Sequence, residues 1–121
     1  MKPEKITFLY DAEADILYVA FGSSRSGIGL LINDNLLLRM DQRMQTLIGL
    51  SIFDYQETTQ KNRIELYGLN EMSAETKNLA LTLLQNPPLN RFLTLKRNGR
   101  DKFYVKPMLN DLRIETLLKA A

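Results

Sequence analysis

The chain has 121 residues, 45% of them hydrophobic and 25% charged, with a formal net charge of +2 and neither cysteine nor histidine. Such totals are typical of a globular protein that buries one hydrophobic core. The missing residue types exclude disulfides, thiolate nucleophiles, imidazole bases and the usual zinc sites, so catalysis would have to depend on carboxylates, lysine, tyrosine or serine. The composition therefore favours a protein that is not an enzyme, and no cofactor is expected.

No targeting segment is expected at the start of the chain. The charged residues of Met1–Lys5 are not followed by the apolar run of a secretory signal. The densest apolar segment, Leu47–Phe53, is far shorter than the roughly 20 residues of a membrane-spanning helix. We therefore expect a cytoplasmic protein with no membrane partner.

The first half of the chain predicts an antiparallel meander of four or five strands. Its apolar segments are short, rich in β-branched, leucine and aromatic residues, and separated by polar or glycine-containing turns. The first two are expected to pair as a hairpin, with Tyr10 and Tyr18 in cross-strand contact. The predicted strands are Ile6–Tyr10, Ile16–Phe21, Ile28–Ile32, Leu36–Met40 and Leu47–Phe53.

These predicted strands are apolar on both faces, as the triplets Leu30–Ile32 and Leu36–Leu38 show. A sheet with one face in water would alternate between apolar and polar residues. Both faces therefore need a cover, and one layer of helices covers only one face. The C-terminal region or a second copy of the chain must cover the other, and we expect a homodimer.

The second half predicts a loop, a short strand and then a helix. Residues 56–63 are polar, and Ile64–Leu69 could form a strand. Ser73 is a candidate N-cap for a helix that runs to about Asn86, where Pro87-Pro88 ends it. The side chains expected to be buried on this helix are Leu79, Ala80, Leu83 and Leu84.

A hairpin and a last helix are predicted after the prolines. Asn98-Gly99 fits a two-residue turn that would pair Lys96 with Asp101 and Thr94 with Phe103. Asn110 can cap a final helix, whose apolar residues at helical spacing are Ile114, Leu117, Leu118 and Ala121. The expected fold class is α+β: a small antiparallel meander over residues 1–70, and a helix, hairpin and C-terminal helix over 71–121, packed as one domain.

The segment Tyr10–Val19, YDAEADILYV, resembles the signature Tyr-Asp-x-Glu-Ala-Asp-x-Leu-Tyr of the domain of unknown function 2283 family, a group of short bacterial proteins. The second half of the family pattern corresponds in part to Leu36–Asp41 and Ile48–Asp54, with Met44–Thr46 in place of the family's turn glycine. The resemblance covers about residues 6–55. It implies a small antiparallel sheet with a packed helix, and it brings no known activity. Since some members are encoded beside small toxin-like proteins, it also implies a candidate protein partner encoded nearby.

Asp11, Glu13 and Asp15 place three carboxylates within five residues. They are not an EF-hand, because Ile16 and Gly22 stand where that calcium loop needs its glycine and its bidentate glutamate. Two readings remain. The carboxylates could bind Mg²⁺ or perform acid–base chemistry in a hydrolase. Alternatively, their side chains bond nearby backbone N–H groups and stabilise the hairpin turn.

Charge is unevenly distributed along the chain. Residues 1–87 carry eight Lys or Arg and eleven Asp or Glu, whereas residues 88–121 carry eight and three. Basic residues surround the aromatics of the predicted hairpin, which is typical of a nucleic-acid interface and also of solvated strand ends that protect a sheet edge. The candidate nucleic-acid-binding residues are Arg91, Lys96, Arg97, Arg100, Lys102, Tyr104 and Lys106.

Three functions follow from these patterns, in decreasing order of support. The first is a small protein-interaction module that forms a homodimer, because apolar strand surface exceeds what one protomer covers. The second is nucleic-acid binding by the basic hairpin. The third is a metal-dependent hydrolase that uses the three clustered carboxylates.

Overall fold

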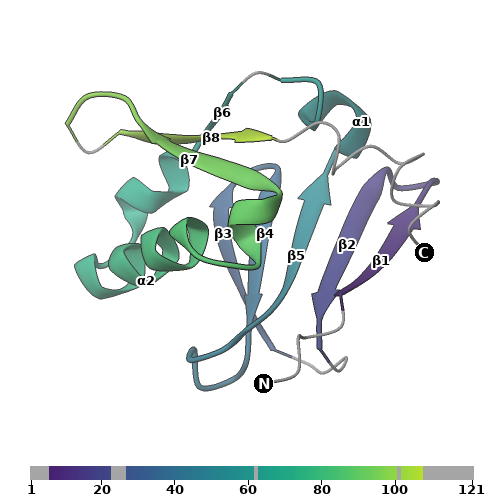
Figure 1. Cartoon of the computed structure of the whole chain (residues 1–121), viewed down its shortest axis with the longest axis horizontal. Helices are drawn as coiled ribbons and strands as arrows, with labels where there is room; N and C mark the ends of the chain where they lie inside the picture. The colour runs from purple at the N-terminus through teal and green to yellow at the C-terminus, as the bar shows by residue number, and fades with distance from the viewer. Residues whose placement is uncertain (1–5, 23–26, 62, 101, 108–121) are drawn as a thin grey trace. The chain divides into compact units, whose positions relative to one another are not determined.

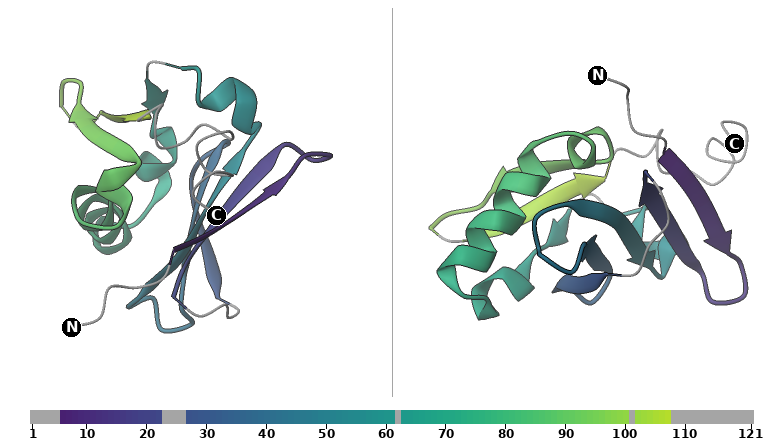
Figure 2. Two further views of the ribbon diagram at one scale, coloured as in Figure 1. Left: turned by 45° about the vertical axis from the view of Figure 1, so that its right-hand side comes forward. Right: turned by 90° about the horizontal axis from the view of Figure 1, so that it is seen from below.

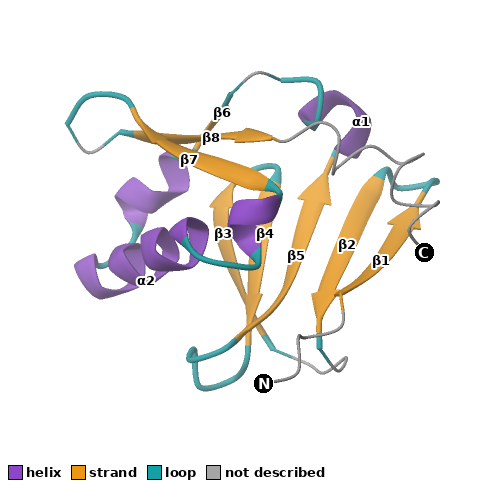
Figure 3. Ribbon diagram, in the orientation of Figure 1, coloured by secondary structure: helices purple, strands orange, loops and turns teal. Residues whose placement is uncertain are grey.

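The computed structural model describes residues 6–22, 27–61, 63–100 and 102–107, which form two compact units divided after Gln56 (Figure 1). Strands predominate over helices in both views of the secondary structure (Figures 1 and 3), so the protein is of the mixed α+β class. The final helix predicted from Asn110 lies outside the described residues. No helix in the described ranges is long and apolar enough to cross a membrane.

The first unit is a five-stranded antiparallel sheet, and all five predicted strands are confirmed. Two hairpins, β1–β2 and β3–β4, flank the last strand, which gives the order β1-β2-β5-β4-β3. Figure 2 shows the β1–β2 hairpin at one edge of this sheet. The strands are β1 (Ile6–Asp11), β2 (Ile16–Phe21), β3 (Ile28–Asn33), β4 (Leu36–Met40) and β5 (Leu47–Phe53).

This strand order corrects the predicted meander, in which β2 would lie beside β3. β5 is inserted between the two hairpins and pairs with β2 on one side and β4 on the other. Every residue of β5 except Phe53 is buried. The most buried strand therefore occupies the centre, where the neighbouring strands on both sides shield it from water.

The two faces of this sheet differ in exposure. One face is buried, and its central residues are Leu17, Val19, Leu36, Leu38, Leu50 and Ile52. Tyr10 pairs with Leu17, and Leu9 pairs with Tyr18. The two tyrosines therefore lie on opposite faces, and the expected Tyr10–Tyr18 contact is wrong, because side chains alternate along each strand.

The second unit combines a three-stranded sheet of order β6-β8-β7 with one longer helix (Figures 2 and 3). The short helix α1 (Tyr55–Thr58) spans the division between the units, where a loop was expected. The predicted strand at 64–69 is limited to two residues and continues as a 3-10 helix. The elements are β6 (Ile64–Glu65), η1 (Tyr67–Glu71), α2 (Ala74–Gln85), η2 (Leu89–Arg91), β7 (Leu93–Arg97) and β8 (Phe103–Pro107).

The helix α2 agrees with the sequence prediction. Ser73 is its N-cap, and the Ser73 hydroxyl accepts a hydrogen bond from the backbone N–H of Thr76 at 3.2 Å. Ala80 and Leu84 are buried, whereas Leu79 and Leu83, which were also expected to be buried, are only half-buried. The local capping chemistry was therefore sufficient to locate this helix.

The hairpin β7–β8 exists, but its predicted register is wrong. Lys96 pairs with Tyr104, and the turn is a five-residue loop closed by the hydrogen bond from the Asn98 N–H to the Lys102 carbonyl, at 2.7 Å. The observed register places Leu95 opposite Val105, which also pairs with Ile64. Matching the apolar residues of three strands outweighs the local turn preference of Asn98-Gly99.

Candidate functional site

The second face of the five-stranded sheet carries a row of side chains that crosses every strand and is apolar except at Ser51 of β5. We call it the apolar row. The strand pairing places the residues of this row directly opposite one another on neighbouring strands. The two ends of the row are unusually exposed, with Leu9 65% and Leu31 50% accessible. We call the surface made by this row and the next one the open face; its residues are Leu9, Tyr18, Ser51, Leu37 and Leu31, followed by Thr7, Ala20, Gly49, Arg39 and Gly29.

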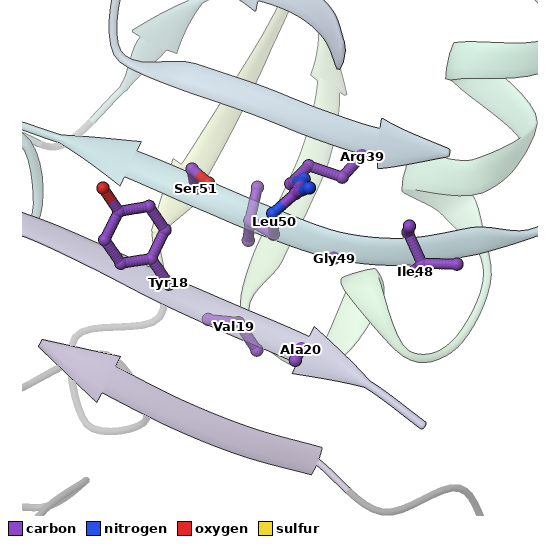
Figure 4. Close-up of a pocket in the computed structure, with 8 residues that line it drawn as sticks. All are labelled: Tyr18, Val19, Ala20, Arg39, Ile48, Gly49, Leu50 and Ser51. Atoms are coloured by element: carbon purple, nitrogen blue, oxygen red, sulfur yellow. The ribbon is translucent and has the colours of Figure 1, made fainter. Parts of the chain in front are cut away.

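A shallow hollow of about 50 Å³ lies at the centre of the open face (Figure 4). Gly49 and Ser51 of β5 form its floor, with Tyr18 of β2 and Arg39 of β4 on either side. A Cβ atom at Gly49 would lie 2.9 Å from the Val19 carbonyl oxygen. Because glycine has no side chain, the surface is hollowed at this position. The hollow admits the end of one side chain and is much smaller than the ~300 Å³ of a small-molecule site.

The three signature carboxylates lie in and beside the β1–β2 turn. Asp11 accepts a hydrogen bond from the backbone N–H of Ala14 at 3.1 Å, and Asp15 accepts one from the Tyr10 hydroxyl at 2.6 Å. Glu13 is exposed. Across the described residues, no group of three or more acidic side chains is arranged to hold a metal ion. In this geometry Asp11 and Asp15 support the turn through local hydrogen bonds.

Asp15 also connects the hairpin to the end of β5. Its backbone has φ of 56°, a left-handed conformation that aspartate tolerates better than most residues. The Asp15 carbonyl accepts a hydrogen bond from the Tyr55 N–H at 3.0 Å, and the Asp15 carboxylate lies 3.4 Å from the Gln56 N–H. The Tyr10 and Tyr55 rings pack with centroids 5.5 Å apart. Nothing in the local sequence pattern pointed to Tyr55 and Gln56 as partners of the signature.

The hydrogen bond to the Asp15 carboxylate raises the pKa of Tyr10 above its usual 10.0, and the Gln56 side chain opposes this effect. A raised pKa means that the folded state holds the phenol proton more tightly than the unfolded state. The contribution of this hydrogen bond to the free energy of unfolding is therefore fully present below pH ~10. It is lost as the pH rises through the pKa of Tyr10 in the folded state.

We expect an NMR titration of the Tyr10 ring to give a pKa above 10.0, the usual value for tyrosine. The substitution Asp15→Ala removes the main cause and should return the Tyr10 pKa toward its usual value. An unchanged Tyr10 pKa in folded Asp15→Ala would contradict the assigned cause.

The basic candidates are distributed over several elements of the second unit. Arg91 lies in η2, Lys96 and Arg97 end β7, and Arg100 and Lys102 lie in the loop to β8; Tyr104 and Lys106 lie within β8. All five lysines and arginines from Lys96 to Lys106 are exposed, as is Arg91. The fold therefore keeps all six cations in water and places the five from Lys96 to Lys106 on one hairpin.

Tyr104, the predicted stacking residue, already has a cation over its ring. The Arg63 guanidinium carbon lies 4.1 Å from the Tyr104 ring centroid, and Arg63 also pairs with Glu65 at 2.7 Å. Phe103 is approached by Lys77 Nζ at 5.7 Å and by the Arg97 guanidinium carbon at 5.9 Å. The contributions of Arg63 and Lys77 could not be predicted, because they are distant from the hairpin in sequence.

Comparison of the chain with models of protein families, with curated proteins and with solved structures gives no match. The resemblance to the domain of unknown function 2283 family therefore stays a prediction from the Tyr10–Val19 signature.

Proposed function

We propose that the protein is a small non-enzymatic interaction module that forms a homodimer through the open face. The observation that carries the proposal is the apolar row that ends in the exposed side chains of Leu9 and Leu31, at opposite edges of the sheet. Exposed apolar surface of this kind usually marks a protein–protein contact. The absence of histidine and cysteine supports a role without catalysis.

A second copy suits the shape of the open face. Two sheets packed face to face interdigitate their side chains, and a two-fold axis brings the same surface of each copy together. The low floor at Gly49 and Ser51 can receive a larger side chain such as Tyr18 from the partner. In such a dimer, residues beside the hollow of each copy would fill the hollow of the other copy.

The size of the open face sets the expected affinity. Five strands about 4.8 Å apart and about six residues long, at about 3.3 Å each, give the whole of this sheet face, of which the open face is a part, a projected area of roughly 480 Å² per copy. Stable interfaces bury about 800 Å² per partner, and weak ones less than about 600 Å². We therefore expect a reversible dimer with a dissociation constant in the micromolar range.

Sedimentation equilibrium at about 50 µM, a concentration at which a micromolar complex is well populated, should detect this dimer. The double substitution Leu9→Lys/Leu31→Lys puts four unpaired charges into the interface and should weaken association at least tenfold. Tyr67→Lys is the matched control, since Tyr67 is a 49% exposed apolar side chain of the second unit. It should leave association unchanged.

Two outcomes would contradict the proposal. The first is a strict monomer at this concentration. The second is a dimer that Leu9→Lys/Leu31→Lys and Tyr67→Lys weaken equally, because association would then not depend on the open face.

A further inference from the structure

A cavity of about 230 Å³ lies in the second unit, between the end of β6, the 3-10 helix η1 and the start of β8. Two aromatic residues line it, Tyr67 and Phe103. The hydrogen bond from the Leu66 N–H to the Phe103 carbonyl, at 2.9 Å, holds the two segments together. The remaining lining residues are Glu65, Leu66, Asn70 and Lys102.

The lining is suited to a planar heteroaromatic ring. Tyr67 is 49% exposed and offers an apolar surface next to the half-buried ring of Phe103. Asn70 and Glu65 bring polar groups of the kind that pair with the edges of bases. The cavity is below the ~300 Å³ of drug-sized pockets, so it admits one base without the rest of a nucleotide.

Positive charge gathers around this cavity from three elements. Lys102 lines it, and Lys77 of α2 and Arg97 of β7 both approach the ring of Phe103 to within 6 Å of its centroid. The adjoining segment, residues 91–107, carries six basic residues and one acidic residue. If one base of a nucleic-acid strand occupied the cavity, the phosphates next to that base would therefore lie near the cations of the neighbouring hairpin.

We infer that the second unit binds single-stranded nucleic acid, with one base in the cavity beside Tyr67 and Phe103 and the phosphates on the hairpin β7–β8. The inferred site is independent of dimerisation through the open face. It replaces Tyr104 with Tyr67 and Phe103 as the base-contacting aromatics, because Tyr67 and Phe103 line the cavity and Tyr104 does not.

A single strand fits better than a duplex or an acidic protein. A duplex keeps its bases stacked, and α2 carries one lysine and one glutamate, so it is not a basic recognition helix. An acidic peptide could use the cations of the hairpin, but its carboxylates would gain nothing from the aromatic rings of Tyr67 and Phe103 that line the cavity. A base, in contrast, can stack on an aromatic side chain.

Fluorescence anisotropy with a labelled 12-nucleotide strand of mixed sequence, prepared as DNA and as RNA, tests the inference. Three or four phosphate contacts predict affinity that falls about 20- to 50-fold between 50 and 200 mM salt. The double substitution Arg100→Glu/Lys102→Glu should weaken binding and reduce this salt dependence. Arg43→Glu, a charge reversal at an exposed residue of the first unit, is the matched control and should have little effect.

The cavity is tested separately from the charge. Tyr67→Ser should weaken strand binding about tenfold, as expected from the loss of one stacked base. It should leave the salt dependence and the binding of inorganic polyphosphate unchanged. The DNA and RNA strands distinguish the source of the ligand, since a contact to the 2′-hydroxyl would favour RNA.

Several results would overturn the inference. One is the absence of strand binding at 50 mM salt by the folded protein. Another is an unchanged strand affinity in Tyr67→Ser, which would leave only non-specific attraction by charge. A third is binding of polyglutamate or of the matching duplex as tight as that of the single strand, which would favour an acidic protein or double-stranded DNA.

Discussion

Replacing Gly27 with alanine is expected to lower the free energy of unfolding by about 3 kcal/mol, at the upper end of the usual cost of overpacking. A Cβ atom at Gly27 would overlap the Met40 carbonyl oxygen and would lie 2.7 Å from Ile48 Cδ1. The closest obstacle is backbone at the end of β4, which cannot rotate away as a side chain can. Urea unfolding followed by circular dichroism measures the loss, with the slope of the transition as the check on unchanged compactness.

Gly29→Ala is the matched control for this substitution. A Cβ atom there would meet Leu37 Cδ1 at 3.0 Å, and that methyl group ends a flexible side chain that can move. We expect a loss below about 1 kcal/mol, because a small rotamer adjustment relieves the contact. Equal losses in the two variants would contradict the close approach of Gly27 to β4.

Replacing Asp15 with alanine is expected to lower the free energy of unfolding by at least about 1 kcal/mol, because alanine would stand at φ of 56°, a left-handed backbone conformation that it tolerates poorly. The change also removes the acceptor of the 2.6 Å hydrogen bond from the Tyr10 hydroxyl, which adds to the loss. Urea unfolding of both proteins at neutral pH measures the difference.

Glu13→Ala provides the control within the same signature. Glu13 is exposed, so its removal should change stability by no more than about 0.5 kcal/mol. The pair also tests the metal hypothesis. If the three carboxylates bound Mg²⁺, the ion would raise the melting temperature of the parent protein, and Glu13→Ala would reduce that increase. A turn that acts only through local hydrogen bonds predicts no response to Mg²⁺ in any of the three proteins.

Much of the secondary structure could be read from local patterns. The five strands of the first sheet follow from short β-forming segments between turn residues, and α2 follows from Ser73 and Pro87-Pro88 at its two ends. These signals depend on neighbours in sequence and need no knowledge of the rest of the fold. The Asp15 turn was foreseen for the same reason, as one of two readings of the signature.

The partners across the fold were decided by tertiary packing. The position of β5 between two hairpins, the pairing of Ile64 with Val105, and the contacts of Tyr55 with Asp15 and Tyr10 each join segments distant in sequence. Several pairings satisfy the local preferences equally, and burial of the largest apolar area selects among them.

The same distinction applies to the two proposed surfaces. Apolar residues on both faces of the strands indicated excess apolar surface, but only strand pairing aligned Leu9 with Leu31 across the sheet and showed which face stays exposed. The basic hairpin was visible in sequence, whereas the cavity needed Tyr67 of η1 beside Phe103 of β8. Alternation and charge are local properties of a chain, while a surface or cavity exists only once distant segments are brought together.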